Sequence, residues 1–476
     1  MAFNSIHFFE FWILLYLLFL LFNEINSKFR NVILLIGSLF FFWKLSGFGV
    51  FLLLAVSFID FVLAKRIHQT QNDNLKSKLL TISILLNVSI ILFFNHFADW
   101  FDFYNSTSSF HVPKFIQFAS VSFYAFRSLG YVFDVFYENI DTPERNIVNY
   151  WNYASFFPII LSGPIGNADT FLTRINTPKI QIPTSYISKG LFLITLGVVK
   201  KFILGNYISI NFVDRVFESY TFFTPLELSL ASVGQTFSLY LDFSGYTDIA
   251  VGLSMLLGFE IIENFNFPFL SQNITEYWKR WHISLSKWFN QNLYFPLSYQ
   301  LRSLQKLGTL ISVFIVFAVS GFWHGTAVHF WFWGILHAAA LMWDVISSNW
   351  RITWRKITPK FIYKPLSILL TFTFLTISGI YFKAESITQG NEMVLRIFSS
   401  HDFTLFPQWI NLYPWVAVSL LLVIIVQFGF SKIYNNVYTI VEKTHWIIPL
   451  ILFLIVLFIA YQFHLMGSLP FSYLQF

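Results

Sequence analysis

The sequence contains no cysteine and carries little charge. Without cysteine, the chain can form no disulfide, no thiolate metal site and no cysteine acyl-enzyme intermediate. Charged residues make up 11% of the 476 residues, whereas soluble proteins average about 25%. So few charges cannot cover a water-soluble protein of this length. Most of the surface must therefore face something other than water.

Long apolar runs take the place of the missing charge, and hydrophobic residues form 56% of the chain. A helix that crosses a bilayer needs about 20 mostly apolar residues, and by this length rule we count about 11 to 13 membrane segments. The sequence therefore predicts an all-α polytopic membrane protein. The segments are expected near residues 6–22, 31–44, 47–64, 79–96, 184–204, 226–241, 308–323, 327–347, 364–382, 413–430 and 446–464, with two interrupted stretches at 117–137 and 150–164.

The positions of the basic residues predict an orientation. Lys28 and Arg30 follow the first expected span, and Lys65 and Arg66 follow the third. Because cytoplasmic loops are enriched in lysine and arginine, both loops are placed in the cytoplasm and the N-terminus outside. The net charge of +6 is explained by such loops and by contact with the lipid bilayer, so no nucleic-acid partner is expected.

We predict one membrane domain over residues 1–476, with no internal repeat. Within it, residues 118–345 form the expected catalytic core, and residues 1–117 and 346–476 form flanking transmembrane helices. Polar residues, prolines and glycines interrupt the apolar pattern in the core. A backbone that is not helical at membrane depth is tolerated only where it is buried in protein or lines a watery cavity. A functional site is therefore sought in the core.

The first candidate segment places carboxylates in an apolar run, at residues 242–248 (Asp-Phe-Ser-Gly-Tyr-Thr-Asp). Ionisable residues inside a membrane are costly and usually face the protein interior or a cavity. Asp242 and Asp248 are six residues apart and lie on different faces of a helix, so they are not expected to form one carboxylate dyad. Pairing of Asp242 with a lysine or arginine is at least as strongly favoured as catalysis.

The second candidate segment, residues 275–289, is amphipathic and rich in tryptophan, with Lys279, Arg280 and Lys287 interspersed. This composition is typical of a helix that lies in the membrane interface, which would make the segment a surface anchor. The alternative is a re-entrant segment that brings His282 to a cavity, with the three cations near an anionic donor.

The third candidate is His324, which ends an apolar run and is followed by Gly325. A single histidine in such a place is more often structural than catalytic, but glycine leaves room for a substrate to approach. Histidine, with a pKa near 6.5 when free, can accept a proton at neutral pH. On one unbroken helix His337 would point to a different side, so we interpret it as structural.

Other site chemistries find little support. No histidine pair has the i, i+4 spacing of a helical zinc site, and no glutamate accompanies the histidines, so no metal is predicted. There is also no Gly-x-Ser-x-Gly motif to supply a nucleophilic serine.

The order of the motifs resembles the membrane-bound O-acyltransferase (MBOAT) family. The matching runs are residues 242–248, then 263–266 (Glu-Asn-Phe-Asn), 280–286 (Arg-Trp-His-Ile-Ser-Leu-Ser), 323–325 (Trp-His-Gly) and 333–337 (Trp-Gly-Ile-Leu-His). The chain is most similar to the bacterial branch that contains the alginate O-acetyltransferase membrane subunit, with the protein that D-alanylates teichoic acid as a relation. Asn290 and Gln291 stand where this branch usually has Arg-Asp, which weakens any inference about the donor or acceptor.

This resemblance implies a helical core with re-entrant segments around a transmembrane tunnel, in a multi-pass protein of the bacterial cell (inner) membrane. It makes His324 the main catalytic residue and His282 its partner. The donor would be an acyl thioester, either acetyl-CoA or an acyl carrier, with no bound cofactor and no metal. The residues expected to bind substrate are Trp323, Asn266, Trp281, Arg280, Asp242 and Ser244.

The resemblance also implies a reaction: transfer of an acyl group, most simply acetyl, from the cytoplasmic thioester to a hydroxyl of an extracytoplasmic polysaccharide or cell-envelope polymer. The transfer could be direct or pass through an extracytoplasmic acyltransferase partner. One alternative is D-alanyl transfer to a teichoic-acid-like polymer. Another is a non-enzymatic transporter or flippase of acylated lipid or glycan, although many transporters contain repeats. A third is a scaffold that recruits a transferase.

Overall fold

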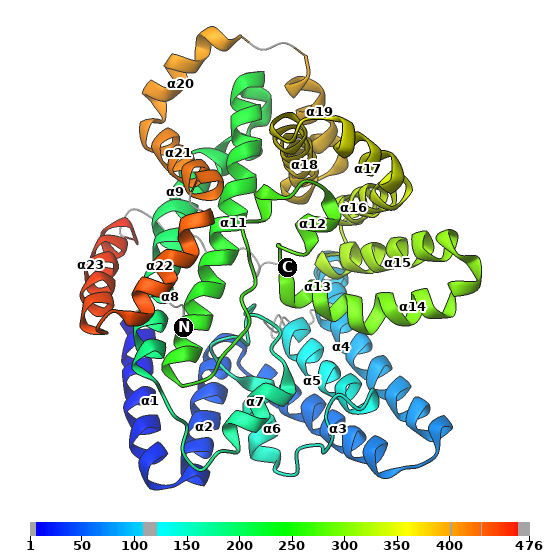
Figure 1. Ribbon diagram of the computed structural model, residues 1–476, viewed down its shortest axis with the longest axis vertical. Coiled ribbons are helices and arrows are strands. Elements are labelled where there is room, and N and C mark those ends of the chain that lie inside the picture. The colour runs from blue at the N-terminus through cyan, green and yellow to red at the C-terminus, as the bar shows by residue number, and fades with distance from the viewer. Residues whose placement is uncertain (1–5, 108–120, 400–401, 430, 465–476) are drawn as a thin grey trace. The chain divides into compact units, whose positions relative to one another are not determined.

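The computed structural model describes residues 6–107, 121–399, 402–429 and 431–464 (Figure 1). These described residues are 82% helical and contain no strand. This confirms the prediction of an all-α polytopic membrane protein. The expected start of the core at residue 118 lies outside the described residues.

Among the described residues, five helices are long and apolar enough to cross a membrane, or up to eight if each bent helix pair counts as one span. This is fewer than the count of about 11 to 13 from the length rule. The difference arises because several expected segments are not single straight helices. The expected segment at residues 184–204, for example, is an α-helix over Thr184–Val198 that continues as a π-helical segment over Val199–Gly205.

The chain divides into two compact units. The first contains Met1–Ile194, Thr247–Ile262 and Thr444–Phe453, and the second contains Thr195–Tyr246, Glu263–Lys443 and Leu454–Phe476. The helices that begin in the first unit are α1 (Ile6–Ile25), α2 (Ser27–Ser46), α3 (Gly49–Gln69), α4 (Asp73–Thr107), α5 (Val121–Phe136), α6 (Ile147–Ser155), α7 (Ala168–Ile175), α8 (Thr184–Val198) and α23 (Ile447–His464).

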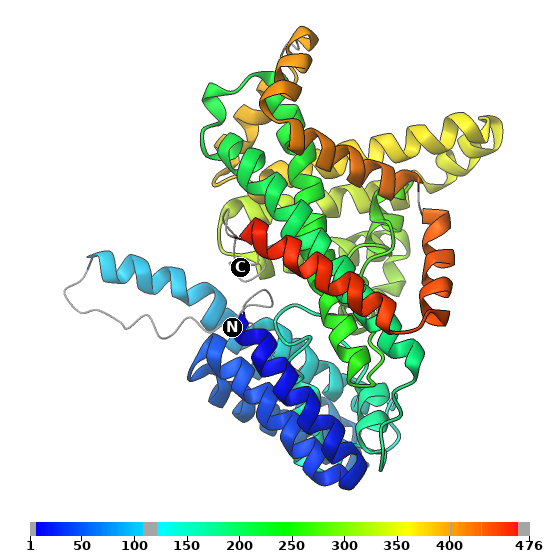
Figure 2. The same ribbon diagram turned by 90° about the vertical axis from the view of Figure 1, so that its left-hand side faces the viewer.

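Hydrogen bonds of buried polar side chains and edge-to-face packing of aromatic rings stabilise the first unit. The fully buried Arg30 of α2 donates hydrogen bonds to the Asn23 side chain at 3.0 Å and to the backbone oxygen of Ile175 at 2.7 Å. Phe157 packs its ring against Phe41 at 5.5 Å. Residues 156–165, where the sequence predicted a broken helix, are all buried. Their irregular backbone is therefore enclosed in protein, as the membrane requires. Helices α1 to α3 appear in dark blue in Figure 2.

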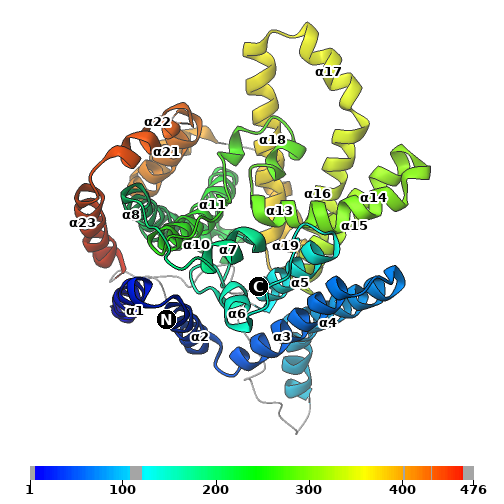
Figure 3. The same cartoon turned by 60° about the horizontal axis from the view of Figure 1, so that its bottom comes forward.

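The second unit carries most of the predicted motifs. Its helices are α9 (Asn206–Ile208), α10 (Asp214–Glu218), α11 (Pro225–Leu256, which ends in the first unit), α12 (Ile274–Trp278), α13 (Ile283–Phe289), α14 (Phe295–Gln300), α15 (Lys306–His324), α16 (Val328–Ile346), α17 (Ser348–Ile357), α18 (Lys360–Lys383), α19 (Ile387–Ile397), α20 (Phe406–Leu412), α21 (Pro414–Gly429) and α22 (Ser431–Lys443). Two π-helical segments, Val199–Gly205 and Ser209–Val213, flank α9. Figure 3 shows α17 joining α16 to α18.

Helices α15 and α16 form a hairpin whose close crossing depends on two glycines. A Cβ atom on Gly334 would lie 2.6 Å from the backbone oxygen of Phe317, and one on Gly321 would lie 2.8 Å from that of Phe330. Real Cβ contacts are not this short, so any larger side chain would force the two helices apart. This crossing positions the end of α15, where His324 lies.

Candidate active site

A cavity of about 50 Å³ in the second unit brings three imidazoles together. His282, His324 and His337 all line it, so the two histidines that the family resemblance paired are in one site. The remaining lining is mostly apolar and aromatic, with a few polar groups. It consists of Gln235, Thr236, Leu239, Phe269, Tyr277, Trp278, Trp281, Leu285, Ser320, Trp333, Leu375, Ser378, Gly379 and Phe382.

His324 is the last residue of α15 and is only 6% exposed. Its ring lies edge-on to Trp333 and Phe382, with ring centres 5.1 Å apart in both cases. A Cβ atom on the next residue, Gly325, would lie 2.6 Å from the Phe330 ring. The missing side chain of Gly325 therefore leaves room for the Phe330 ring, and the expected approach of a substrate at this glycine stays a prediction.

His282 lies in a strained turn between α12 and α13. Its backbone is left-handed, with φ of 44° and ψ of 55°. A residue other than glycine pays an energetic penalty in this region, and such residues cluster at functional sites. The turn points the ring at Phe243 of α11, with ring centres 4.7 Å apart.

Asn264 sets the proton position on His282. The Asn264 side-chain oxygen lies 3.2 Å from Nδ1 of His282 and accepts hydrogen bonds from the backbone nitrogen and hydroxyl of Ser284. Because this oxygen can only accept, Nδ1 of a neutral His282 carries the proton and Nε2 has a free lone pair. Nε2 is buried and has no partner among the described residues.

The His282 imidazole is neutral in this environment. His282 lies outside every candidate membrane span. Burial, together with the nearby His324, lowers its pKa to about 3. At pH 7 the side chain is therefore a hydrogen-bond acceptor at Nε2 and not a cation.

His337 and Trp278 also belong to this cavity, although the sequence did not indicate it. Helix α15 ends at His324 and α16 returns along it, so His337 lies at the cavity. The two histidines do not share one unbroken helix, because the expected segments 308–323 and 327–347 are separate helices, and a structural role for His337 stays a prediction. His337 stacks on Phe317 and lies 5.4 Å from Trp278, measured between ring centres. In the described part of the chain, His337 Nδ1 and Trp278 Nε1 are buried without a hydrogen-bond partner. The indole N–H of Trp278 is a donor, and leaving such a buried donor without an acceptor costs free energy, so it is available to a ligand.

The other predicted substrate-binding residues are divided among three places. Trp281 lines the three-histidine cavity, and Asp242 lines a second cavity. Arg280 is held by Glu276 at 2.9 Å and by the backbone oxygen of Asn266 at 3.1 Å. Neither cavity's described lining includes Arg280, Asn266, Trp323 or Ser244, although Trp323 packs its ring 4.6 Å from His324.

Asp242 is paired with Lys201 in a buried ion pair. Lys201 lies in the π-helical segment Val199–Gly205, and Asp242 lies on α11. Their side chains are 5% and 9% exposed. The pairing that the sequence favoured at least as strongly as catalysis is therefore present.

We expect Asn264→Leu to lower kcat about tenfold, because losing a hydrogen bond that holds the His282 ring raises the barrier by roughly 1.4 kcal/mol. The measurement is the rate of acyl transfer by purified protein. Ser284→Ala is the matched control, since it removes another hydrogen bond to the same oxygen and leaves His282 held. Equal losses in both variants would show that Asn264 only supports the fold.

Comparison of the sequence with known proteins assigns the chain to a family. The model of the family described as "MBOAT, membrane-bound O-acyltransferase family" matches residues 37–382, which is most of the chain. The chain belongs to this family. The matched region includes all three histidines of the cavity as well as Asp242 and Lys201.

Individual relatives agree with the assignment. The chain is 28% identical over 390 residues to a peptidoglycan O-acetyltransferase of Helicobacter pylori, covering 76% of this chain and 72% of the relative. It is 29% identical over 392 residues to a "Probable alginate O-acetylase" of Azotobacter vinelandii, covering 80% and 74%. It is 28% identical over 273 residues to a teichoic acid D-alanyltransferase of Bacillus subtilis, covering 56% and 68%.

These similarities confirm the predicted family and its bacterial branch. The protein is an O-acyltransferase and a multi-pass protein of the bacterial inner membrane. Membership of an enzyme family favours catalysis over the transporter and scaffold alternatives. Among the described residues, no group of three His, Asp or Glu side chains could hold a metal ion.

Proposed function

We propose that the protein transfers an acetyl group from a cytoplasmic acyl thioester to a hydroxyl of an extracytoplasmic polysaccharide or cell-envelope polymer. The observation that carries the proposal is the cavity in which His324, His282 and His337 meet. The Helicobacter and Azotobacter relatives, each matched over more than 70% of its own length, are named as O-acetylating enzymes. The relative named for D-alanyl transfer matches 56% of this chain, so acetyl is preferred over D-alanine.

In the proposed reaction, His324 is the general base. The acceptor hydroxyl attacks the thioester carbonyl carbon as His324 takes up the hydroxyl proton. The carbon–sulfur bond then breaks, and the proton passes from His324 to the departing thiolate, giving an ester and a free thiol. Direct transfer of this kind requires no covalent intermediate on the enzyme, which accords with a chain without cysteine.

His282 is proposed to stabilise the protonated form of His324. Its Nε2 lone pair faces no other partner among the described residues and can accept a hydrogen bond from a protonated imidazole. With its proton on Nδ1, neutral His282 cannot donate a hydrogen bond to an oxyanion from Nε2. Asn266, which the sequence analysis expected to bind substrate, is exposed and outside the described cavity lining.

Trp278 is proposed to donate to the thioester carbonyl oxygen as negative charge develops there. An indole N–H can only donate, and this one is buried at the cavity without an acceptor among the described residues. Fixed donors of this type stabilise the tetrahedral intermediate of acyl transfer.

Trp278→Phe is expected to lower kcat about tenfold, or roughly 1.4 kcal/mol of transition-state stabilisation, with KM for the thioester nearly unchanged. Phenylalanine keeps an aromatic ring beside His337 and removes only the N–H group and part of the ring. Steady-state kinetics on purified protein measures both constants. If KM rises and kcat stays constant, Trp278 shapes the thioester pocket and donates nothing to the transition state.

The experiment that tests the proposed function measures both the consumption of the thioester donor and the formation of an ester on the acceptor. Purified protein in lipid nanodiscs is incubated with acetyl-CoA or an acetyl-loaded carrier protein, together with oligosaccharide acceptors. Thiol release and ester formation on the acceptor are measured separately.

Release of thiol from the donor in an amount equal to the new ester, with one of the two donors preferred, supports the proposal. Transport of an acylated molecule across the bilayer without thioester consumption would overturn it. Ester that forms only when a second extracytoplasmic protein is added would place that partner between this enzyme and the polymer.

A further inference from the structure

We propose that a second cavity in the second unit binds an uncharged, hydroxyl-rich sugar unit of the acceptor. The inference rests on the proposed function and narrows its acceptor class: neutral sugars are favoured over uronates and over phosphate-linked polymers. It is argued from the position of the cavity, its polar groups and its charge.

The second cavity has a volume of about 260 Å³ and adjoins the first. Gln235, Leu239 and Phe382 line both cavities, so these side chains separate the two spaces. The Phe382 ring lies 5.1 Å from the His324 ring, measured between ring centres, so a hydroxyl that extends past Phe382 from the larger cavity would come close to His324. The volume is far above the roughly 30 Å³ that one water molecule occupies, and it is close to the lower end of ligand pockets, at about 300 Å³.

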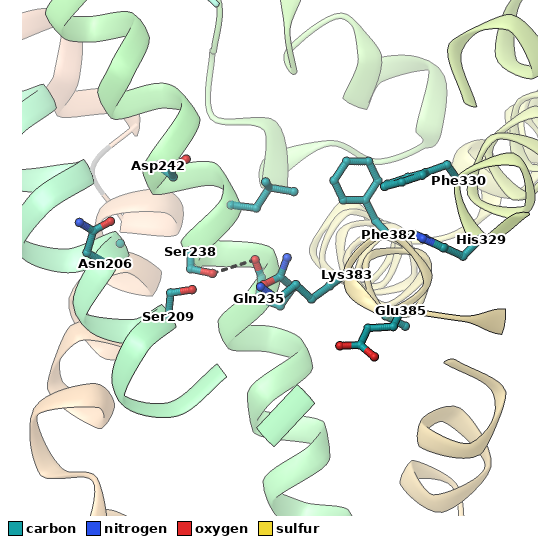
Figure 4. A pocket seen from close by; sticks show the side chains of 13 residues that line it. Asn206, Ser209, Gln235, Ser238, Asp242, His329, Phe330, Phe382, Lys383 and Glu385 are labelled. Carbon is teal, nitrogen blue, oxygen red and sulfur yellow. Dashed lines mark hydrogen bonds between the residues drawn. The ribbon is translucent and has the colours of Figure 1, made fainter. Parts of the chain in front are cut away.

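Two kinds of surface face each other across this cavity (Figure 4). On one side, Asn206, Ser209, Gln235 and Ser238 contribute amide and hydroxyl groups from α9, the adjoining π-helical turn and α11. On the other side lie the rings of Phe330 and Phe382. Amides and hydroxyls both donate and accept hydrogen bonds, as sugar hydroxyls do. The rings can cover the apolar face of a sugar.

The charges around the cavity disfavour an anionic ligand. Lys383 is the lysine of the described lining, and its ammonium is 2.8 Å from an Asp214 carboxylate oxygen. Asp242 is balanced by Lys201. Glu385 adds a further carboxylate to the lining. A uronate or a phosphodiester bound here would be repelled by the carboxylates of the lining. The described lining offers no uncompensated lysine or arginine to offset the cost of desolvating the anion. Placing like charge against an unwanted ligand is one way in which a protein excludes it.

The test compares four probes by ligand-detected NMR on full-length protein in nanodiscs. They are N,N′-diacetylchitobiose, digalacturonic acid, glycerol 3-phosphate and a serine-containing tripeptide. We expect the neutral disaccharide to bind at least tenfold more tightly than the other three. Asn206→Leu should weaken this binding at least tenfold. Asn211→Leu is the matched control and should leave binding unchanged, because Asn211 bonds the Tyr207 backbone oxygen and is outside the described lining.

The outcomes separate this inference from the proposed function. Preference for the uronate or the phosphate, or no binding of the disaccharide, overturns the inference even if the thioester is consumed. Preference for the peptide also overturns it and points to a protein hydroxyl as the acceptor. Equal weakening in both asparagine variants assigns the loss to folding and overturns the placement of the site. Disaccharide binding without thioester consumption in any condition would sink the proposed function and leave a sugar-binding cavity.

Discussion

His324→Ala protein is expected to insert and fold but to lose acyl transfer by about 10²–10⁴-fold, the usual contribution of a positioned general base. An alcohol attacks a thioester poorly unless its proton is removed as the new bond forms. His324 lies at the cavity beside His282 and His337. Thiol release from the acyl donor and ester formation on an acceptor are measured with matched amounts of wild-type and variant protein.

A matched histidine control separates chemistry from expression. His68 is exposed near the end of α3 in the first unit, so His68→Ala should keep wild-type rates. The His324→Ala protein must also elute as a monodisperse peak and keep its melting temperature within a few degrees of the wild-type value. This check is needed because the substitution removes the ring contacts of His324 with Trp333 and Phe382. Near-wild-type turnover by folded His324→Ala protein would remove the general-base assignment. His337→Ala is informative in the same assay, since it would reveal a third imidazole acting on the reaction.

Asp242→Leu is expected to destabilise the second unit by about 3–5 kcal/mol, because it removes the carboxylate that is paired with the buried Lys201 ammonium. Both side chains are almost completely buried, with 5% and 9% of their surface exposed. The measurement is the midpoint of thermal unfolding in detergent, followed by the fraction of monodisperse protein. Loss of activity should parallel loss of folded protein.

Two further variants make this prediction specific. Lys201→Met combined with Asp242→Leu removes both charges and should recover most of the stability, since an apolar pair of similar volume is often tolerated where an ion pair was buried. Asp214→Asn disrupts the Lys383 pair, whose side chains are 36% and 18% exposed, and should cost only about 0–1 kcal/mol. If the double variant folds normally but acyl transfer stays absent, Asp242 acts on the substrate and its ion pair is not its main role.

The sequence alone determined the class of protein and the main participants in its site. Scarce charge and long apolar runs dictate a helical membrane protein, because each segment must satisfy its own backbone hydrogen bonds in lipid. The order of the motifs indicated the family and singled out His324 and His282. Hydropathy and motifs can be recognised in the sequence without knowing which residues are close to one another in the folded protein.

Only the tertiary structure decided which groups meet. The break after His324 folds α16 back, so His337 joins the cavity that an unbroken helix would have kept it from. The left-handed turn at His282 directs its ring toward Phe243, and Asn264 holds it. The pairing of Asp242 with Lys201, 41 residues away in sequence, and the second cavity beside His324 depend on helix packing. Such contacts join residues far apart in the chain, and hydropathy along a sequence contains no information about which helices will be neighbours.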